Sequence, residues 1–475
     1  MTKRVFIAVP EFTPHETIEK MRRKARNEGY VPLFAIDIKV NDSLEPHAFD
    51  EEKKTQYFYD LCEQLTSCDR IIANLTPVLG TEPDPDVTFQ LGYMAAQNKP
   101  VHAYTNVSKT LCERVLEWNQ TPFTTQEHPS ASGAPTLTDY DRNGMRIENM
   151  GIKNPQIDSD NPGEDSYHHP MLEGPSIMSG IPVQTPALLG IEVPEEALYS
   201  NTNVFNRVCQ DIKKYRQTEQ NPTIYHKYKE DPNAAYIAGP GEFLPNSERY
   251  FVEAKEHMDS FHMRGVSPND EPINFDSIKA SAFPNGNNPL LRKAVYEARL
   301  ANIAKAGLGI INLTPHRGVH PESSAVFEMG YMVGKDRALW KIPRVFGFSN
   351  SPHALNERIK NWKNSPLGPG YGTELALQRP SNHIYSKMVD GAILASKGHL
   401  DHRPSSLVAK ANSLEGVNTY SDIATFKACV ANIALKTQAE KAPNTSRFSI
   451  WTQPLSKEET QRINEDKRRS ALNVS

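Results

Sequence analysis

The feature that most constrains this chain is an internal repeat. Asn74-Leu75-Thr76-Pro77 returns as Asn312-Leu313-Thr314-Pro315, at an offset of 238 residues. At the same offset, residues 89–94 return as 327–332. Two looser matches keep the same order along the chain: 6–10 with 236–240, and 171–174 with 388–391.

Four landmarks in one order indicate two copies of a single unit of about 220 residues. A length of 475 residues would otherwise suggest roughly three domains. We therefore expect a first domain at 1–225, a second at 226–455, and a short charged tail at 456–475.

Each copy has the pattern of an α/β unit. Buried strands are predicted at 5–9 and 70–75 in the first copy, with a helix at 88–97 and a strand at 101–104. The second copy repeats this with strands at 234–238, 308–313 and 344–348 and a helix at 325–334. Alternating strands and helices predict a parallel, doubly wound sheet, and such sheets bind ligands at the carboxyl ends of their strands.

Composition narrows the functional classes. A net charge of −4 lacks the cationic excess of a nucleic-acid-coating protein, so no nucleic-acid binding is expected. No apolar run is long enough for a membrane span or a signal peptide. Five cysteines without a CxxC pair argue against a disulfide framework and a zinc site, and favour a cytoplasmic protein. We expect no metal and no cofactor; His168-His169, beside Glu164 and Asp165, lacks the helical spacing of a metal site.

Two long polar segments, 119–197 and 365–416, are rich in Pro, Gly, Ser and His. Loops of this length in a compact domain are usually either functional or disordered.

The strongest candidate for chemistry is Glu328, about one turn into the helix predicted after His316-Arg317-Gly318. The positive end of the helix dipole favours an ionised carboxylate there. An ionised carboxylate at the ligand edge of an α/β sheet is suited to nucleophilic attack on an electrophilic carbon. On position alone, a solvated glutamate on an ordinary helix is the more common explanation of such a residue.

Several motifs resemble the nucleoside 2-deoxyribosyltransferase family, and the resemblance covers most of both copies. In the second copy they are Tyr236-Ile237-Ala238-Gly239-Pro240 with Phe243, the run 310–318, Pro321-Glu322 and 327–331. In the first copy they are 72–77, Glu82-Pro83-Asp84, Phe89, Gly92-Tyr93, Asp141 to Gly151, and Pro170-Met171-Leu172.

The resemblance implies two tandem flavodoxin-like, Rossmann-like domains and glycosyl transfer at the anomeric carbon of a nucleoside. The family's nucleophilic glutamate corresponds to Glu328, which would form a covalent glycosyl-enzyme that a second base or water resolves. The acid that handles the base corresponds to Glu322, where the family usually has Asp. A loop acid at a helix start remains the structural alternative for Glu322.

Other residues are candidates for substrate binding. Tyr236 and Phe243 could stack on a base, although Tyr236 could equally be strand core. Arg317 could hold a phosphate or a carboxylate, which would shift the substrate from a nucleoside to a nucleotide. The remaining candidates in the second copy are Gly239, Pro240, Asn312 and Gly318.

The first copy departs from the family pattern. Gln90 stands at the nucleophile position, and an amide lacks the anionic charge that the chemistry needs. Leu79 replaces Arg317, and Val9 replaces Gly239. Asp84 is retained, so the first copy could still bind a ligand, and we include Asp84 and Gln90 among the candidate binding residues.

The later family motif, which reaches across a subunit interface, is better preserved in the first copy. It includes Asn143 and His169, and its counterpart in the second copy is centred on Ser386. We therefore expect a fused pseudo-dimer in which the second copy supplies Glu328 and the first copy supplies a loop that completes its site. Whether such chains assemble further into a homo-oligomer is left open.

The sequence thus predicts transfer or hydrolysis of the N-glycosidic bond of (deoxy)nucleosides or their monophosphates, in nucleotide salvage. The expected partners are the nucleoside or nucleotide and a free nucleobase. A sensor or regulatory protein that binds nucleotides without catalysis is the alternative, and Gln90, Val9, Glu322 and Ser386 favour it.

Overall fold

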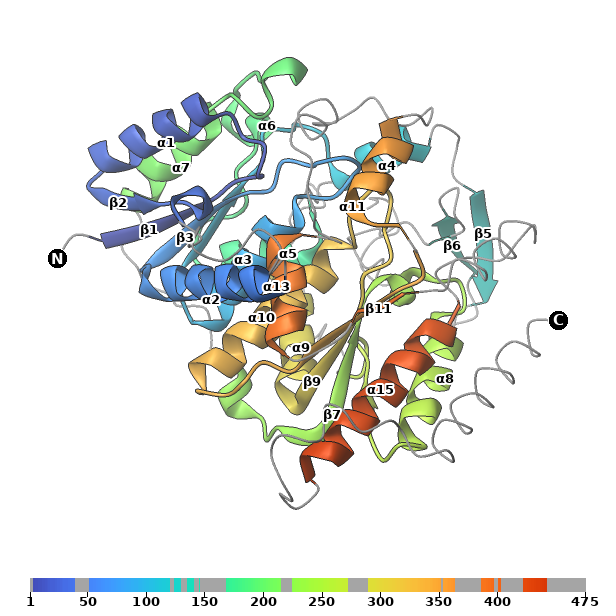
Figure 1. Cartoon of the computed structure of the whole chain (residues 1–475). Helices are drawn as coiled ribbons and strands as arrows, with labels where there is room; N and C mark the ends of the chain where they lie inside the picture. The colour runs from blue at the N-terminus through green and yellow to red at the C-terminus, as the bar shows by residue number, and fades with distance from the viewer. Residues whose placement is uncertain are drawn as a thin grey trace.

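The computed structural model describes residues 3–38, 51–119, 124–129, 135–140, 145, 168–214, 224–271, 289–351, 353–363, 386–396, 400–402 and 422–441. Two sheets, one from each copy, lie on either side of a central layer of helices (Figure 1). The tail at 456–475 and the segment around Asn143 lie outside the described residues.

The first copy supplies a sheet in the order β2-β1-β3-β4, in which every neighbouring pair is parallel. A separate antiparallel hairpin, β5-β6, follows it. The elements are β1 (Lys3–Ala8), α1 (His15–Asn27), β2 (Tyr30–Leu33), η1 (Ala35–Asp37), α2 (Glu51–Ser67), β3 (Arg70–Asn74), α3 (Pro85–Ala96), β4 (Val101–Tyr104), α4 (Leu111–Asn119), β5 (Thr124–Pro129), β6 (Pro135–Tyr140), α5 (Pro170–Met178), α6 (Pro186–Leu189), η2 (Glu195–Ala197) and α7 (Asn203–Lys214).

The second copy supplies a parallel sheet in the order β8-β7-β9-β10-β11. Both sheets therefore follow the flavodoxin-like order, with the first strand between the second and the third. The elements are η3 (Ile224–Lys227), β7 (Asp231–Ala238), η4 (Pro240–Phe243), α8 (Ser247–Asp259), β8 (Arg264–Val266), α9 (Pro289–Lys305), β9 (Ala306–Asn312), α10 (Ser323–Ala338), β10 (Val345–Ser349), α11 (Leu355–Lys363), α13 (Lys387–Ala395), β11 (Leu400–His402) and α15 (Ala424–Lys441).

The predicted α/β class and the parallel doubly wound sheets are confirmed. The helix expected at 88–97 begins three residues earlier, because Asp84 caps α3 and Pro85 occupies its first turn. The sequence pattern missed β2, β8, β11 and the helices α2 and α9. The polar segment 119–197 is not loop throughout, since α5 lies within it.

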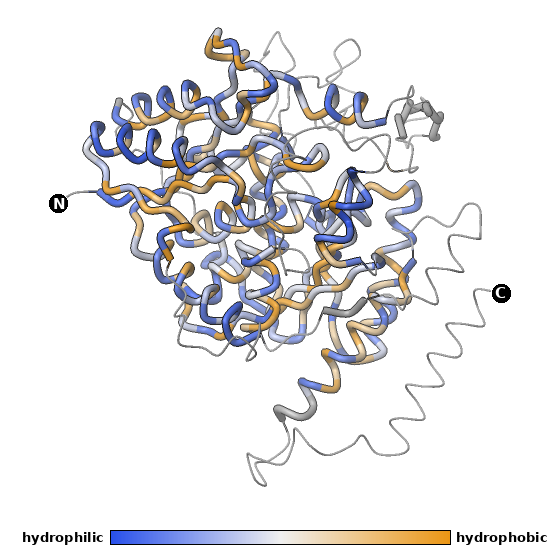
Figure 2. The backbone as a smooth tube through the Cα atoms, turned by 45° about the horizontal axis from the view of Figure 1, so that its top comes forward, coloured by the Kyte–Doolittle hydropathy of each residue, from blue (hydrophilic) through white to orange (hydrophobic). Residues whose placement is uncertain are grey.

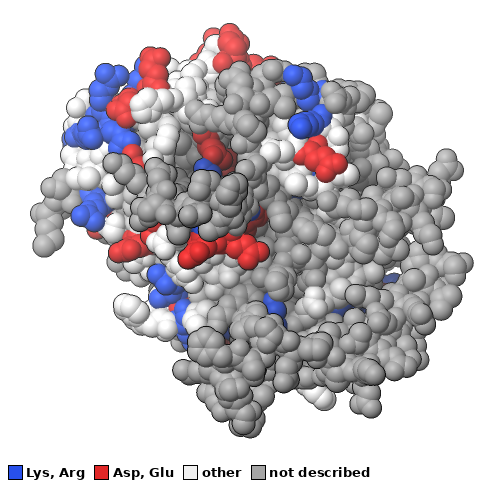
Figure 3. All heavy atoms as spheres, in the orientation of Figure 1, with Lys and Arg blue, Asp and Glu red and all other residues white. Residues whose placement is uncertain are grey.

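The outer helices bury one side only. In α1, Ile18, Met21 and Ala25 face the first sheet at helical spacing. Figure 2 shows the resulting alternation of hydrophilic and hydrophobic turns. Acidic and basic side chains lie next to one another over α1 in Figure 3, and Lys20 pairs with Glu16 at 2.8 Å there. Within the described ranges, no helix combines the length and the apolar character needed to cross a bilayer.

The central layer joins the copies through a close crossing of α3 and α10. A Cβ on Gly92 would lie 2.1 Å from the Phe327 carbonyl oxygen, and a Cβ on Gly330 would lie 2.1 Å from the Phe89 carbonyl oxygen. Each helix therefore needs a glycine where it meets the other backbone. One continuous hydrophobic core runs from the first sheet through this crossing to the second.

The copies exchange equivalent contacts around this crossing. Gly174 of α5 lies on Tyr296 of α9, and Gly391 of α13 lies on Phe58 of α2. The repeated segments 171–174 and 388–391 each contain one acidic residue, and both acids make buried ion pairs across the same contacts. Glu173 pairs with Arg292 at 2.8 Å, and Asp390 pairs with Lys54 at 3.5 Å. The repeat thus forms a pseudo-dimer within one chain.

We predict that Gly330→Ala destabilises the protein by about 3 kcal/mol, although alanine favours helices, because the new methyl group would overlap the α3 backbone. Gly29→Ala is the matched control: Gly29 has a φ of +86° but open space around it. The control should cost about 1 kcal/mol of backbone strain. Urea unfolding of both variants measures the difference, and equal stabilities would contradict the prediction.

Candidate active site

The repeated Asn-Leu-Thr-Pro motif shapes the loops at the carboxyl edge of each sheet. Asn312 Oδ1 accepts hydrogen bonds from the Thr314 backbone N–H at 3.0 Å and from its hydroxyl at 2.6 Å. Asn74 and Thr76 make the same two bonds at the same distances. These turns end the central strands and lead into the helices that carry the functional candidates. A substrate-binding role for Asn312 stays a prediction.

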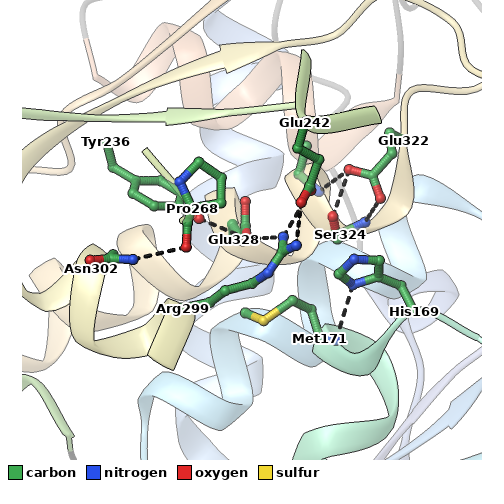
Figure 4. A network of polar contacts seen from close by, with 11 residues as sticks. His169, Met171, Tyr236, Glu242, Pro268, Arg299, Asn302, Glu322, Ser324 and Glu328 are labelled. Carbon is green, nitrogen blue, oxygen red and sulfur yellow. Dashed lines mark hydrogen bonds and ion pairs between the residues drawn. The ribbon is translucent and has the colours of Figure 1, made fainter. Parts of the chain in front are cut away.

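Glu328 lies in the second turn of α10 and its residue exposure is 1%. Its Oε1 accepts a hydrogen bond from the Tyr236 hydroxyl at 2.9 Å and a longer one from Arg299 Nη1 at 3.4 Å (Figure 4). Both bonds go to Oε1, so among the described residues Oε2 is the oxygen left for a reacting atom. Tyr236 is therefore part of the buried strand core and also contacts the carboxylate through its hydroxyl; stacking of Tyr236 on a base stays a prediction.

The charge state of Glu328 differs from the expectation drawn from the helix dipole. Burial raises its pKa to about 7, and the nearby Glu242 also raises it, against the opposing effects of Arg299 and Tyr236. Loss of water around a buried carboxylate outweighs the field of the helix terminus. Glu328 is therefore balanced between its acid and its ionised form near neutral pH.

Glu242 and Arg299 complete the charged cluster, and sequence reasoning missed both. Arg299 Nη1 donates to Glu242 Oε1 at 2.9 Å, and its Nη2 donates to Glu242 Oε2. The pair joins η4 to α9, which lie far apart in the sequence. No local motif marks Arg299, although Glu242 stands immediately before the predicted Phe243.

Glu322 is the N-cap of α10. Its carboxylate accepts hydrogen bonds from the backbone N–H groups of Ser324 at 2.7 Å and Ala325 at 2.8 Å, and from the Ser324 hydroxyl at 2.6 Å. Glu322 is therefore an acid at the start of a helix, which was the alternative to a role in handling the base. Figure 4 places the cap close to Glu242 and His169, so a role toward the base stays a prediction.

The first copy contributes residues to this site. His169 caps α5 by accepting from the Met171 N–H at 3.2 Å, and its ring lies edge-on to Phe243 with centroids 6.4 Å apart. Phe243 in turn stacks on His316, with centroids 5.6 Å apart. Met145, from the expected cross-copy segment, is buried in one cluster with Phe243. The described residues of the expected cross-copy segment, Met145 and His169, thus contact the group around Phe243; Asn143 is outside the described residues.

The remaining candidates in the second copy are backbone positions at the edge of the site. Gly239 has a φ of +126°, and a Cβ there would lie 2.5 Å from the Cβ of Asn312. Pro240 begins η4, which carries Glu242 and Phe243. Arg317 has a φ of +48° and is 1% exposed, in the loop that meets the first copy, where Gly318 pairs with Gly80. A ligand role for Arg317 stays a prediction.

Among the described residues, no hydrogen bond or ion pair joins Asp84 or Gln90 to Glu328. They belong to the equivalent place in the first copy, where Asp84 caps α3 and the Met388 N–H of the second copy donates to Asp86 at 2.8 Å. Burial raises the pKa of Asp84. The Gln90 side-chain oxygen is buried and accepts no hydrogen bond from the described residues.

Metal ligands do not gather here. In the part of the chain that the structure describes, no group of three or more His, Cys, Asp and Glu side chains could hold a metal ion. Burial, Arg299 and His316 lower the pKa of His169, so this histidine is neutral in the site.

Comparisons with known proteins bear on both copies. A sequence profile described as nucleoside 2-deoxyribosyltransferase matches residues 5–155 and 235–382, which together exceed half of the chain. A solved structure described as a 2-desoxiribosyltransferase from Leishmania mexicana is 21% identical, with a TM-score of 0.20, over 28% of this chain and 78% of that chain. No protein with a curated description matches the sequence. On the profile match in both copies, this chain belongs to the nucleoside 2-deoxyribosyltransferase family.

Proposed function

We propose that the protein transfers or hydrolyses the N-glycosidic bond of (deoxy)nucleosides or nucleoside monophosphates through a covalent glycosyl-Glu328 intermediate. Membership of the family supports glycosyl transfer on nucleosides. The observation that carries the finer proposal is the buried carboxylate of Glu328, held at Oε1 by Tyr236 and Arg299. A carboxylate fixed through one oxygen presents the other as a nucleophile.

The reaction would proceed by two displacements. Glu328 Oε2 attacks the anomeric carbon, the bond from that carbon to the base nitrogen breaks, and its electron pair leaves with the base. A proton from Glu322 or from water neutralises the departing base. A nitrogen of a second base, or a water oxygen, then attacks the same carbon. The bond from that carbon to Glu328 breaks and releases the carboxylate, and the attacking atom gives its proton to Glu322 or to water. Two inversions retain the configuration of the sugar.

The aromatic side chains at the site favour a planar base as part of the substrate. Phe243 and His316 form a stacked pair, and His169 from the first copy lies against it. The faces of bases are commonly recognised by aromatic stacking. We assign the sugar to the side of Glu328 and the base to this aromatic group, and we place the activity in the reuse of nucleosides and free bases.

Only the second copy would carry the covalent chemistry. Glu328→Gln should lower transfer by about a thousandfold or more, because the amide is not a nucleophile. Gln90→Ala, the equivalent change in the first copy, should leave the rate nearly unchanged. The assay incubates a deoxynucleoside with a second free base and separates the products by chromatography.

Each product pattern of that assay has a distinct meaning. A new nucleoside indicates a transferase, and free base alone indicates a hydrolase. No conversion together with measurable nucleoside binding would replace the proposal with a non-catalytic sensor. Full activity in Glu328→Gln would refute the covalent mechanism.

The activity should depend on the ionisation of Glu328. Because burial raises its pKa to about 7, kcat/KM should be constant above pH 8 and should fall by about tenfold per pH unit below pH 6, where the carboxylate is protonated. A pH profile from 5 to 9 measures this. A plateau that extends down to pH 5 would show that Glu328 is not the ionising nucleophile.

The loop from the first copy should matter for the second copy's reaction. We expect His169→Ala to lower kcat/KM by about tenfold, because it removes both the cap of α5 and the ring packed on Phe243. Leu188→Ala, at an exposed position of the same copy, is the control and should have no effect. Equal rates in the two variants would show that His169 of the first copy does not contribute to catalysis.

A further inference from the structure

Two buried carboxylates in the Glu328 site share one guanidinium. The side chains of Arg299, Glu242 and Glu328 are 9%, 7% and 1% exposed. Arg299 donates to both oxygens of Glu242 but to only one oxygen of Glu328, at the longer distance of 3.4 Å. When Glu328 is ionised, these three groups carry one excess negative charge in a buried place.

We propose that Glu242 is a positioning residue for the reaction: by pairing with Arg299 through both oxygens, it limits the arginine to one oxygen of Glu328 and leaves the other free to attack. The inference rests on the proposed function of Glu328. Without Glu242, the planar guanidinium could bind Glu328 in the paired geometry that arginine prefers with carboxylates. Both nucleophilic oxygens would then be engaged.

The first copy shows what happens where this chemistry is lost. α2 and α9 match at the offset of 238 residues, and the equivalent contacts of Phe58 and Tyr296 confirm that register. In that register Leu61 stands for Arg299 and Gln90 for Glu328. In the match of residues 6–10 with 236–240, Phe6 stands for Tyr236. The carboxylate and both of its partners have thus been replaced together by uncharged side chains.

The counterpart of Glu242 changes its partner in the same way. Glu11 precedes Phe12 as Glu242 precedes Phe243, with one residue fewer after the first strand than in the second copy. Glu11 pairs at 2.5 Å with Lys387 at a position more open to solvent. A buried acid bound to an arginine therefore occurs where Glu328 is present, and its equivalent is a more exposed ion pair where Glu328 is absent. This contrast links the Glu242–Arg299 pair to the carboxylate of Glu328.

The charged and titratable groups around Glu328 come from several elements. Tyr236 belongs to β7, Glu242 to η4 and Arg299 to α9. His169 of α5 lies near both Arg299 and His316, which belongs to the loop after β9. Within this set, Glu242 and burial raise the pKa of Glu328, while Arg299 and Tyr236 lower it. Neutralising Glu242 should lower the pKa of Glu328 for two reasons: it removes a negative charge, and it releases Arg299 toward Glu328.

The first test needs no substrate. Unfolded Glu328 ionises near its ordinary pKa of 4.5, whereas the folded residue holds its proton to about pH 7. The native state therefore loses stability between these values relative to a Glu328→Gln variant, which does not titrate. The Tm of Glu328→Gln minus the Tm of the wild type should grow from about pH 4.5 and level off near pH 7. In a Glu242→Gln background, it should level off at least about one pH unit lower.

The second test follows the reaction. In Glu242→Gln, the acid limb of kcat/KM should move to lower pH by the same amount, and kcat above pH 8 should fall by about tenfold with little change in KM, since Arg299 would then hold both oxygens. A merely structural role would lower stability without moving this limb.

A matched control is available on the same helix. Arg292 of α9 forms another buried pair with Glu173, which lies in the first copy. Glu173→Gln should lower stability as much as Glu242→Gln, and should leave both pH midpoints at about 7. An unshifted midpoint in Glu242→Gln, or an equal shift in Glu173→Gln, would overturn the proposal.

If Glu242→Gln fails to fold, the double variant Glu242→Gln/Arg299→Leu tests the same network with the opposite sign. It removes the arginine and copies Leu61 of the first copy, so the pKa of Glu328 should rise above 7; an unchanged value would overturn the proposal. Absence of turnover in the wild type would refute the proposed function, and with it a part for Glu242 in the reaction. The unfolding measurements would still report on the contacts among the three residues.

Discussion

The close crossing of α3 and α10 is the contact on which the rest of the structure depends. Gly92 and Gly330 let each helix touch the backbone of the other, with no room for a Cβ. This contact sets the two sheets on either side of one central helical layer and brings α5 of the first copy to the second copy's site. The interface between the two copies is thus part of the core of a single chain.

The two equivalent sites are both buried, but only the site of the second copy has an ionisable side chain, Glu328, where the first copy has Gln90. In the second copy, Glu328 and Glu242 are buried carboxyl groups that share one arginine. Such a cluster is a poor way to stabilise a fold, because each ion loses its hydration. The first copy has replaced it with Phe6, Leu61 and Gln90. Retention of the cluster in one copy alone is therefore better explained by chemistry than by stability.

Sequence patterns predicted the local parts of this architecture well. The strands β3 and β9, near the centre of each sheet, are buried along their whole length and mostly apolar, so their pattern alone marks them. Short edge strands such as β8 and β11 lack that pattern, and only their pairing with a neighbouring strand defines them. Glu322 illustrates a role that the pattern left open: its position before a helix was evident, but its capping bonds depend on where α10 begins.

By itself, the sequence determined the duplication, the α/β class, the family resemblance and the identity of Glu328 as the candidate nucleophile, since each of these is encoded in residues close together or repeated in order. The tertiary structure decided the surroundings of that nucleophile. Arg299, Glu242 and Tyr236 come from three separate elements, and only packing brings them together. The ionisation of Glu328 followed from the same cause: the helix dipole can be read locally, whereas loss of solvent is a property of the folded chain.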